Sequence, residues 1–402
     1  MRLLFVTYRF PVYDGDAPSN TVLNLVKYFS ASHEISLVGL ARRPVPLDRR
    51  RVLEQYCHRV EIVVWPKWKG AIRALQGLAS TEPFQMAYCR SNTFAAKIRQ
   101  VAVEEQIDLA FAYHLRSGPP LLELSGIPRV LAIHPVQVLH FGRRHELTRN
   151  PLLRAVYGME YRRLVGYEAQ LALRFDSCSL ISARDRDAID PDHILRNVCV
   201  NPHGTDVVSF APPQETVRAP NNIAFCGSLS IDTNVDAVLY FHDQILPRVW
   251  QKRPDVLFTV VGKTPPQRIR RLARDPRVEI TGYVPDVRPY LWKATVGIDP
   301  IRMAAGMQNK LIEGLAAGLP MVITPEANEG ILAPQGTAVR IGQNASEFAG
   351  HILHLLDHPA EAAALAKEGM SFVRAHWSWE HHFRLLEAHF ESLAAGTKCV
   401  GI

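Results

Sequence analysis

The chain has 402 residues, of which 47% are hydrophobic and 21% are charged, which predicts two folded domains and excludes a disordered chain. Its net charge of +7 lies in the first half, because residues 1–200 hold 27 Lys and Arg against 19 Asp and Glu, and the rest holds 19 against 20. No apolar run approaches the roughly 20 residues of a membrane span, and the N-terminus lacks a signal-peptide pattern, so we expect a cytoplasmic protein.

The first half alternates short apolar runs with amphipathic ones, which is typical of a doubly wound α/β domain. The clearest predicted helix is Ser19–Phe29 and the longest is Leu152–Leu173. The predicted strands are Leu3–Thr7, Glu34–Gly39, Val60–Trp65, Leu109–Tyr113, Arg129–Ile133, Ser179–Ser182 and Val198–Asn201.

The first predicted crossover contains a loop with Asp14, Gly15 and Asp16 before its helix. Glycine permits a tight turn near a ligand, and aspartates accept hydrogen bonds from hydroxyl groups. A plain turn with a helix N-cap at Ser19 or Asn20 fits the spacing equally. His134 ends the predicted strand RVLAIH, where it is a catalytic or acceptor-binding candidate or a structural histidine.

The proline-rich segment from Asn201 to Asn222 predicts a domain linker. A second α/β set follows, and the pattern from Phe372 to Ala395 predicts a terminal helix. The predicted strands are Ile223–Gly227, Val256–Gly262, Val278–Gly282, Thr295–Asp299, Met321–Thr324 and Ala338–Ile341.

The stretch from Ala294 to Thr324 reads as strand, glycine-containing loop, helix and strand. Gly318 predicts a left-handed helix cap, and Pro320 prevents the helix from continuing. Lys310 and Glu313 are three residues apart on the first helical turns, so both can face the loop that contains Gly306. Together with the helix N-terminus they favour a phosphate-bearing sugar ligand, although an ordinary surface ion pair has the same spacing.

Two further predicted strands end in glycine beside polar residues. Gly227 and Ser228 end one, and Lys263 follows Gly262 at the end of the other. Because the carboxyl ends of parallel strands share one edge of the sheet, these loops predict one wall of a ligand cleft.

The six cysteines show neither a C-x-x-C pair nor zinc spacing, which indicates reduced structural thiols. His376, His381 and His382 have no acidic or cysteine partner at ligand spacing. We therefore expect no metal site.

The basic half of the chain suits an anionic membrane surface or a phosphate-bearing acceptor, and solvated arginine explains it equally well. Its densest points are Arg49–Arg51, Arg143 and Arg144 with Arg149 and Arg154, and Arg162 with Arg163. We find no nucleic-acid-binding motif and expect no nucleic-acid partner.

Several segments, taken in order, resemble a family 4 glycosyltransferase of the GT-B fold over nearly the whole chain. They are GDAPSN, NPHGTDVVSFAP, FCGSLSIDTNVDAV, VVGKTP, VEITGYVPDVRPYL, GMQNKLIEGLAAGLPMV and the terminal WSWE. The chain is most similar to the bacterial sugar transferases associated with exopolysaccharide and PEP-CTERM systems.

The resemblance implies two facing Rossmann-like domains and a C-terminal helix that crosses back to the first. It implies an acceptor-binding domain at 1–205, a linker at 206–221, a nucleotide-sugar-binding domain at 222–375 and the returning helix at 376–402. It also implies transfer of a hexose-type sugar from a nucleoside diphosphate sugar to a hydroxyl acceptor, with retention of configuration and with neither metal nor cofactor.

The resemblance also implies residue roles. Glu313 would hold the ribose hydroxyls, and Lys310 with Gly306, Met307, Gln308 and Asn309 would hold the diphosphate and sugar. Gly15 and Asp16 would face the transferred sugar, His134 corresponds to a family histidine in a different local context, and the backbone of Tyr283 and Val284 would hold the base.

Two departures from the family pattern stand out. Ala305 replaces the first of the family's two glutamates, and SLSIDTN lacks the usual Arg/Lys pair, which shifts diphosphate neutralisation onto Lys310, Lys263 or an arginine of the first domain.

A UDP-sugar is slightly favoured as donor, and the protein is expected in the cytoplasm or peripherally at the inner membrane. The alternatives are a non-catalytic GT-B subunit that scaffolds a partner transferase, and a nucleotide-sugar epimerase.

Overall fold

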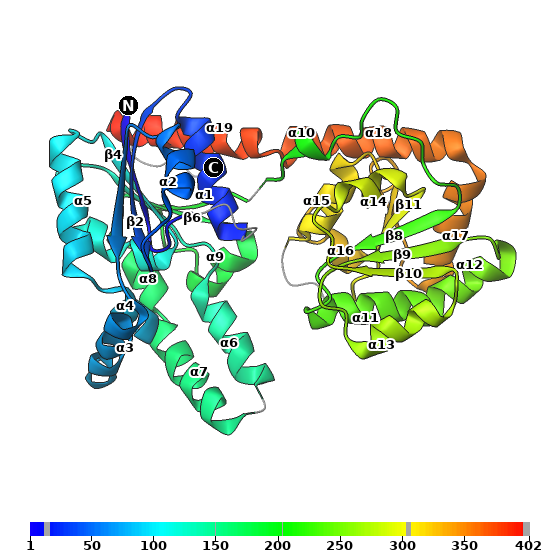
Figure 1. The fold of residues 1–402 in the computed structure, drawn as a ribbon, viewed down its shortest axis with the longest axis horizontal. Helices are drawn as coiled ribbons and strands as arrows, with labels where there is room; N and C mark the ends of the chain where they lie inside the picture. Colours follow the sequence, from blue (N-terminus) through cyan, green and yellow to red (C-terminus); the bar gives the residue numbers. More distant parts are fainter. Residues whose placement is uncertain (12–16, 149, 203, 303–306, 397–402) are drawn as a thin grey trace. The chain divides into compact units, whose positions relative to one another are not determined.

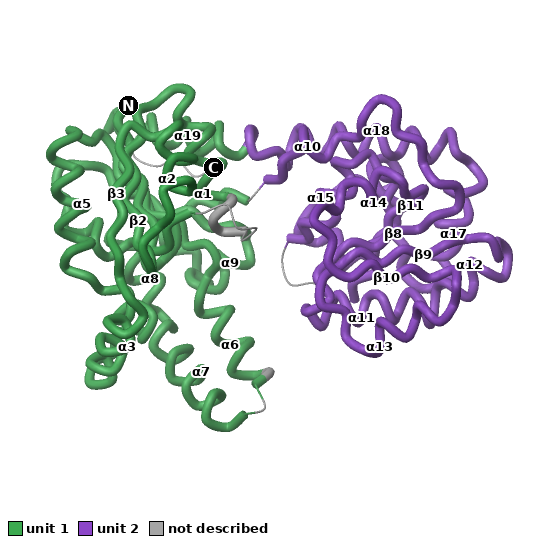
Figure 2. The backbone as a smooth tube through the Cα atoms, in the orientation of Figure 1, with its two compact units in different colours: residues 1–202, 382–402 green, residues 203–381 purple. Residues whose placement is uncertain are grey.

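The computed structural model describes residues 1–11, 17–148, 150–202, 204–302 and 307–396. The chain divides into two compact units, one of residues 1–202 and 382–402 and one of residues 203–381 (Figure 2). The domain boundaries expected from the sequence stay predictions, and each unit is described by itself.

Unit 1 is built on a sheet of seven parallel strands in the order β3-β2-β1-β4-β5-β6-β7 (Figure 1). Every strand predicted for this half is present, with ends that shift by at most two residues. The strands are β1 Arg2–Thr7, β2 Glu34–Ala41, β3 Arg59–Val64, β4 Leu109–Tyr113, β5 Arg129–Ala132, β6 Ser177–Leu180 and β7 Val198–Val200.

Helices and short 3-10 turns connect these strands. The helices are α1 Ala17–Phe29, α2 Leu47–Glu54, α3 Lys67–Gln76, α4 Phe84–Cys89, α5 Asn92–Glu104, α6 Gln137–Leu147, α7 Pro151–Leu164, α8 Tyr167–Ala172, α9 Ala183–Ile189 and the terminal α19 Trp379–Ala394. The 3-10 turns are η1 Gly77–Ala79, η2 Leu115–Ser117 and η3 Pro119–Glu123. Ser19 lies inside α1, so the suggested N-cap at Ser19 or Asn20 is wrong.

An aromatic cluster attaches α19 to unit 1. The ring of Phe390 lies 5.3 Å from both Phe29 and Phe111, and Phe5 packs against these two rings from β1. His389 adds a hydrogen bond of 2.7 Å between its Nε2 and Ser177 Oγ. Buried aromatic area of this kind dominates core energetics, so the predicted return of the terminal helix to the first half of the chain is confirmed.

Unit 2 contains a sheet of six parallel strands in the order β10-β9-β8-β11-β12-β13, and all six were predicted. The strands are β8 Asn222–Cys226, β9 Leu257–Val261, β10 Val278–Gly282, β11 Val296–Asp299, β12 Met321–Ile323 and β13 Arg340–Ile341. The helices are α10 Val207–Phe210, α11 Asp232–Tyr240, the π-helix η4 Phe241–Ile245, α12 Leu246–Lys252, α13 Gln267–Arg270, the 3-10 turn η5 Arg271–Arg274, α14 Arg288–Lys293, α15 Asn309–Ala316, α16 Pro325–Asn328, α17 Ala345–Asp357 and α18 Pro359–His376.

Successive residues of a strand point to opposite faces, and this alternation divides the core of unit 2 into two layers. Ile223 and Phe225 of β8 join the cluster that includes residues of α11, α12 and α17. Ala224 joins the other cluster, which contains Leu311 and Leu315 of α15. Both faces of the sheet are therefore covered, as in a doubly wound fold. Among the described helices, none has the length and apolar composition that crossing a bilayer requires.

Two predicted helices are each broken in the structure. The segment Leu152–Leu173 forms α7 and α8, because Gly166 between them has a φ of +77°, outside the right-handed helical region. The pattern from Phe372 to Ala395 is divided between α18 and α19 at Trp377 and Ser378, where the backbone instead bonds to Thr205. The long helix α18 was not predicted.

The segment predicted as a linker is bonded to unit 2 along much of its length. Arg218 donates to the carbonyl oxygen of Ala294 at 2.7 Å and also to that of Gly318, and Ala219 N donates to Lys293 O. Trp292 Nε1 in turn donates to Phe210 O at 2.7 Å. The segment is therefore attached to the rest of unit 2 at Phe210, Arg218 and Ala219.

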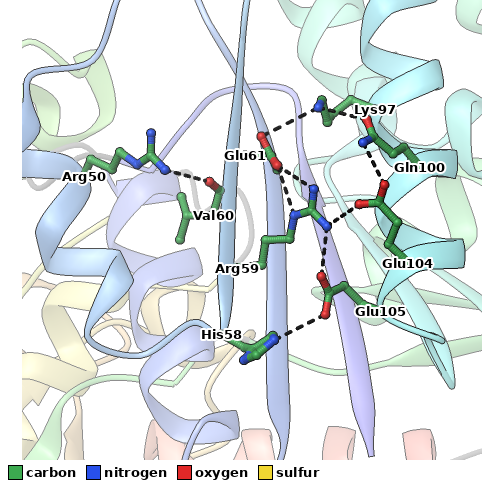
Figure 3. Close-up of polar contacts among 9 residues, drawn as sticks. All are labelled: Arg50, His58, Arg59, Val60, Glu61, Lys97, Gln100, Glu104 and Glu105. Atoms are coloured by element: carbon green, nitrogen blue, oxygen red, sulfur yellow. Dashed lines mark hydrogen bonds and ion pairs between the residues drawn. The ribbon is translucent and has the colours of Figure 1, made fainter.

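A network of charged side chains ties the edge strand β3 to α5 (Figure 3). Arg59 Nη1 donates to Glu104 at 2.6 Å and to Glu105 at 2.9 Å, while its Nη2 donates to Glu61 at 2.8 Å. These carboxylates hold the pKa of Arg59 above its usual value. An arginine with three partners loses less side-chain entropy per bond than a single surface pair does.

We expect Arg59→Gln to lower the free energy of unfolding by roughly 1 kcal/mol, and the loss to shrink at high salt, because the pairs are partly exposed. Denaturant midpoints measure it. The matched control is Arg90→Gln, which removes one exposed pair with Glu82 and is expected to change stability by only a few tenths of that amount. Equal losses in the two variants would contradict the role of the network.

Candidate functional site

The sheet of unit 2 has a topological switch point between β8 and β11. These strands are neighbours in the sheet, but the chain leaves β8 toward β9 on one side and leaves β11 toward β12 on the other. Cys226 and Asp299 are the last residues of the two strands. In open parallel sheets, ligands bind in the crevice at the carboxyl ends of the strands at this point.

The positive charge at this crevice is held in place from two sides. Lys310, in the first turn of α15, places its Nζ 3.5 Å from Asp299 Oδ1 and donates to Gln308 Oε1 at 2.6 Å. Its side chain is only 11% exposed and that of Asp299 is fully buried. A buried ion pair with a second hydrogen bond restricts the ammonium group to a small region at the edge of the sheet.

Glu313 lies one turn further along α15 and is half-buried. Burial raises its pKa to about 7, and the nearby Lys310 charge opposes this rise. The negative charge of Glu313 adds to the burial that raises the pKa of Cys226 to about 12. These electrostatic links place Cys226, Lys310 and Glu313 in one cluster, so the predicted proximity of Lys310 and Glu313 to the strand ends is present in the structure.

The sequence analysis gave Asp299 no role. Burial raises its pKa to about 6, and the ion pair with Lys310 opposes this rise. Among the described residues, no group other than Lys310 interacts with either carboxylate oxygen of Asp299 at hydrogen-bonding geometry. An aspartate that ends an apolar strand (VGID) just before a glycine-containing loop was the available signal, because a carboxylate there is costly without a cation beside it.

The second wall of the crevice comes from the loops after β8 and β9. Gly227 N donates to Val261 O at 2.9 Å, and Leu229 N donates to Lys263 O at 3.0 Å. A Cβ at Gly262 would come within 2.0 Å of Gly227 O, so only glycine allows this approach of the two backbones. Ser228 lies in the same loop and is half-buried, and Lys263 is exposed.

The remaining predicted residues of unit 2 lie at the same edge of the sheet. Met307 packs against the cluster that contains α15, and Asn309 is exposed at the first position of that helix. Tyr283 and Val284 follow β10, which β9 separates from β8, so they lie at the far end of the strand edge. Within the described part of the chain, no side chain caps the first turn of α15, and uncapped amides at a helix N-terminus can bind an anionic ligand.

Three predicted site residues, Gly15, Asp16 and Gly306, lie outside the described residues, as does the replaced position Ala305. His134 belongs to unit 1 and is buried two residues after β5, where its Nε2 lies 3.4 Å from Ser179 Oγ. The ring of Tyr113 packs edge-on against it at 5.8 Å.

Unit 1 has its own switch point, between β1 and β4, and the sequence analysis missed the side chains there. His114 follows β4 with a φ of +81°, which is rare for a residue other than glycine, and its ring lies 4.2 Å from that of Tyr8. Arg116 lies over the Tyr8 ring and donates to Gln85 Oε1 at 2.8 Å. Burial, with Arg116 and then His140 beside it, lowers the pKa of His114 to about 3, so the imidazole is neutral.

One group of described residues has ligand atoms close enough to hold a metal ion, namely His33, Glu387 and Glu391, within 4.8 Å of one another. His33 Nε2 already lies 2.8 Å from Glu387 Oε1, and Tyr28 donates to Glu387 Oε2 at 2.9 Å. These contacts join α19 to the residues after α1, so we assign the group to the attachment of the terminal helix.

Part of the chain is similar in sequence to known glycosyltransferases. Residues 220–358 match the family model described as glycosyl transferases group 1. Over 208 residues the chain is 26% identical to a GDP-mannose-dependent monoacylated alpha-(1-6)-phosphatidylinositol monomannoside mannosyltransferase of Corynebacterium glutamicum. This match includes 44% of the chain and 52% of the relative, so the chain spans about half the length of the curated relative it matches.

The fold of the whole chain is shared with solved glycosyltransferase structures. Sucrose-phosphate synthase from Thermosynechococcus elongatus superposes with a TM-score of 0.67 at 15% identity, over 99% of this chain and all of that one. Anabaena HepE in complex with UDP gives 0.64 at 14%, over 98% and 100%, and TarM gives 0.67 at 10%, over 98% and 99%. The chain therefore has the GT-B fold.

Proposed function

We propose that the protein is a retaining glycosyltransferase that moves a hexose-type sugar from a nucleoside diphosphate sugar, with a UDP-sugar slightly favoured, to a hydroxyl acceptor. The observation that carries the proposal is the cluster of Lys310, Asp299 and Glu313 at the switch point of unit 2, where β11 ends and α15 begins. Anionic ligands bind where a helix N-terminus and a fixed cation meet.

The donor would be held by groups that suit its parts. The carboxylate of Glu313 accepts hydrogen bonds from the ribose hydroxyls, and Lys310 with the first amides of α15 neutralises the diphosphate. Gly227, Ser228 and Lys263 line the diphosphate from the other wall, Met307 to Asn309 contact the sugar, and the backbone of Tyr283 and Val284 holds the base.

As the glycosidic bond breaks, negative charge grows on the departing diphosphate. Because Asp299 and Gln308 already fix the ammonium of Lys310, little reorganisation is needed when that charge develops. The departing phosphate oxygen takes the acceptor proton on the face where the acceptor attacks, which retains the configuration. In this proposal Lys310 and the helix, rather than a metal ion, neutralise the leaving group.

The acceptor would bind to unit 1, where we assign Gly15, Asp16 and His134 to the sugar and acceptor side. His114, Tyr8 and Arg116 at the switch point of that unit extend this assignment. We also infer membership of the exopolysaccharide-associated branch, and peripheral contact with an anionic membrane, which the net charge of residues 1–200 favours.

The direct test is a thermal-shift screen with UDP-, GDP-, ADP- and dTDP-sugars, since a ligand that binds only the folded protein raises its stability in proportion to the logarithm of its concentration over Kd. One base should stabilise the protein and also support sugar transfer to a hydroxyl acceptor. Stabilisation without transfer to any acceptor would favour a scaffold subunit, and interconversion of the free donor without an acceptor would favour an epimerase.

For Lys310→Met we expect kcat to fall roughly 100-fold or more, with a much smaller loss of donor affinity, because the ammonium acts mainly on charge that develops in the transition state. Steady-state kinetics and calorimetric titration of the donor separate the two effects. Lys293→Met, an exposed lysine of the same unit, is the control. Equal losses in kcat and affinity would contradict the catalytic role.

For Glu313→Gln we expect donor affinity to fall about tenfold or more, because a neutral amide replaces a charged acceptor of two hydroxyl hydrogen bonds. Isothermal titration of the donor measures the change. Glu329→Gln, at an exposed position of unit 2, should leave affinity unaltered. A wild-type affinity in Glu313→Gln would remove the residue from the ribose site.

Donor affinity should also rise with pH. Since the pKa of Glu313 is raised to about 7, the carboxyl is largely protonated at about pH 6 and ionised at about pH 8, and only the ionised form is an acceptor at both oxygens. Titrations at these two pH values check the trend. The dependence should vanish in Glu313→Gln, and its persistence there would assign it to another group.

A further inference from the structure

Helix α3 of unit 1 presents an apolar stripe to solvent. Trp68, Ile72 and Leu75 are spaced four and three residues apart, so they share one face, and they are 61%, 47% and 65% exposed. Leu78, in the turn η1 that follows, is 56% exposed and extends the stripe. Single exposed apolar residues are ordinary, but a continuous stripe on one helix marks an interaction site.

The opposite face of α3 is fixed to the protein. Gly70 is buried, and a Cβ there would come within 2.7 Å of the Tyr88 ring of α4. After the helix, Arg163 of α7 donates to the carbonyl oxygens of Gly77 at 2.9 Å and Leu78 at 3.2 Å. The helix therefore cannot rotate to bury Trp68, and the stripe is a constant feature of the surface.

The charges on α3 all have one sign. Lys67 and Lys69 are exposed beside Trp68, whereas Arg73 is half-buried, and residues 67–76 include no Asp or Glu. The ammonium of Lys69 lies 5.5 Å from the centre of the Trp68 ring and 5.8 Å from that of Trp65. A tryptophan flanked by lysines on a short amphipathic helix is the composition of a segment that lies in the headgroup region of an anionic bilayer.

We propose that α3 docks the protein on an anionic membrane, with Trp68, Ile72 and Leu75 inserted among the acyl chains and Lys67 and Lys69 on the lipid phosphates. A lipid surface fits better than a protein partner, because lysine is depleted in protein interfaces and is favoured beside anionic headgroups. Figure 1 shows α3 projecting from the same side of unit 1 as the α6–α7 pair. The exposed Leu152 and Leu153 at the start of α7 give a second, smaller contact.

This assignment differs from the arginine clusters that stand out in the sequence. Arg163 is turned inward to backbone carbonyls and to the Phe84 ring, Arg144 lies over Tyr157, and Arg50 pairs with Glu54. These guanidinium groups are engaged within the protein, while the lysines of α3 accompany an apolar face. Helix α3 therefore provides both contributions to the free energy of interfacial binding, positive charge and apolar area.

The test is co-sedimentation of the full chain with vesicles of phosphatidylcholine alone and of phosphatidylcholine mixed with phosphatidylglycerol. We expect binding to the mixed vesicles that weakens as salt is raised. The double variant Trp68→Ser with Ile72→Ser should bind at least about tenfold more weakly, because each apolar side chain contributes its burial to the partition. The matched control is Val103→Ser on α5, where the valine is 77% exposed and stands apart from α3.

A second measurement locates the helix in the bilayer. Brominated lipids should quench part of the tryptophan emission of the wild type, and that part should be lost in Trp68→Phe, which keeps the apolar face. Donor-induced thermal shifts of all variants should match the wild type, so a failure of membrane docking is distinct from a failure of the proposed transferase activity.

Three results would overturn the proposal. One is vesicle binding that the double variant leaves unchanged, and another is equal, salt-insensitive binding to both kinds of vesicle. The third is a wild-type dimer in sedimentation velocity that the double variant converts to monomer, since a second copy would then be the occupant of the stripe.

Discussion

The buried ion pair between Lys310 and Asp299 is the constraint on which the site depends. A carboxylate with no exposed surface is costly to keep ionised, so Asp299 needs the ammonium beside it, and the ammonium in turn cannot swing into solvent without leaving that charge unpaired. The pair joins the end of β11 to the first turn of α15 across the loop between them. It thus fixes the cation where the helix amides and the strand ends converge.

The strand pattern of both sheets was predictable because buried parallel strands are short, apolar and β-branched, and the order of elements follows from the repeated crossovers. The site was predictable as far as helix α15, because Lys310 and Glu313 in its first turns and Gly318 after its end carry local signals. Two predicted helices were wrong for local reasons that periodicity does not contain. Gly166 adopts a left-handed conformation inside an apolar pattern, and Ser378 leaves helical geometry because its backbone pairs with distant Thr205.

The chemical properties of Asp299 and His114 depend on burial and on neighbouring charges that only the folded structure shows. The raised pKa of Asp299 follows from its burial beside Lys310. The low pKa of His114 arises from burial, with Arg116 and His140 around it. Asp299 ends a strand that lines a switch point, and His114 directly follows one. Sheet order was therefore the missing information, since it decides which strand ends meet.

The charges of the two units differ in their arrangement. At the candidate site of unit 2, Lys310 and Asp299 are paired and Glu313 is half-buried, and such fixed partners suit a localised ligand charge better than a strong overall field does. The basic excess lies in residues 1–200, where α3 combines it with an exposed apolar stripe. An extended anionic surface, such as a membrane, suits this combination of charge and apolar area. The proposed membrane attachment and the proposed donor binding therefore depend on different residues. Substitutions in α3 and in α15 should act independently.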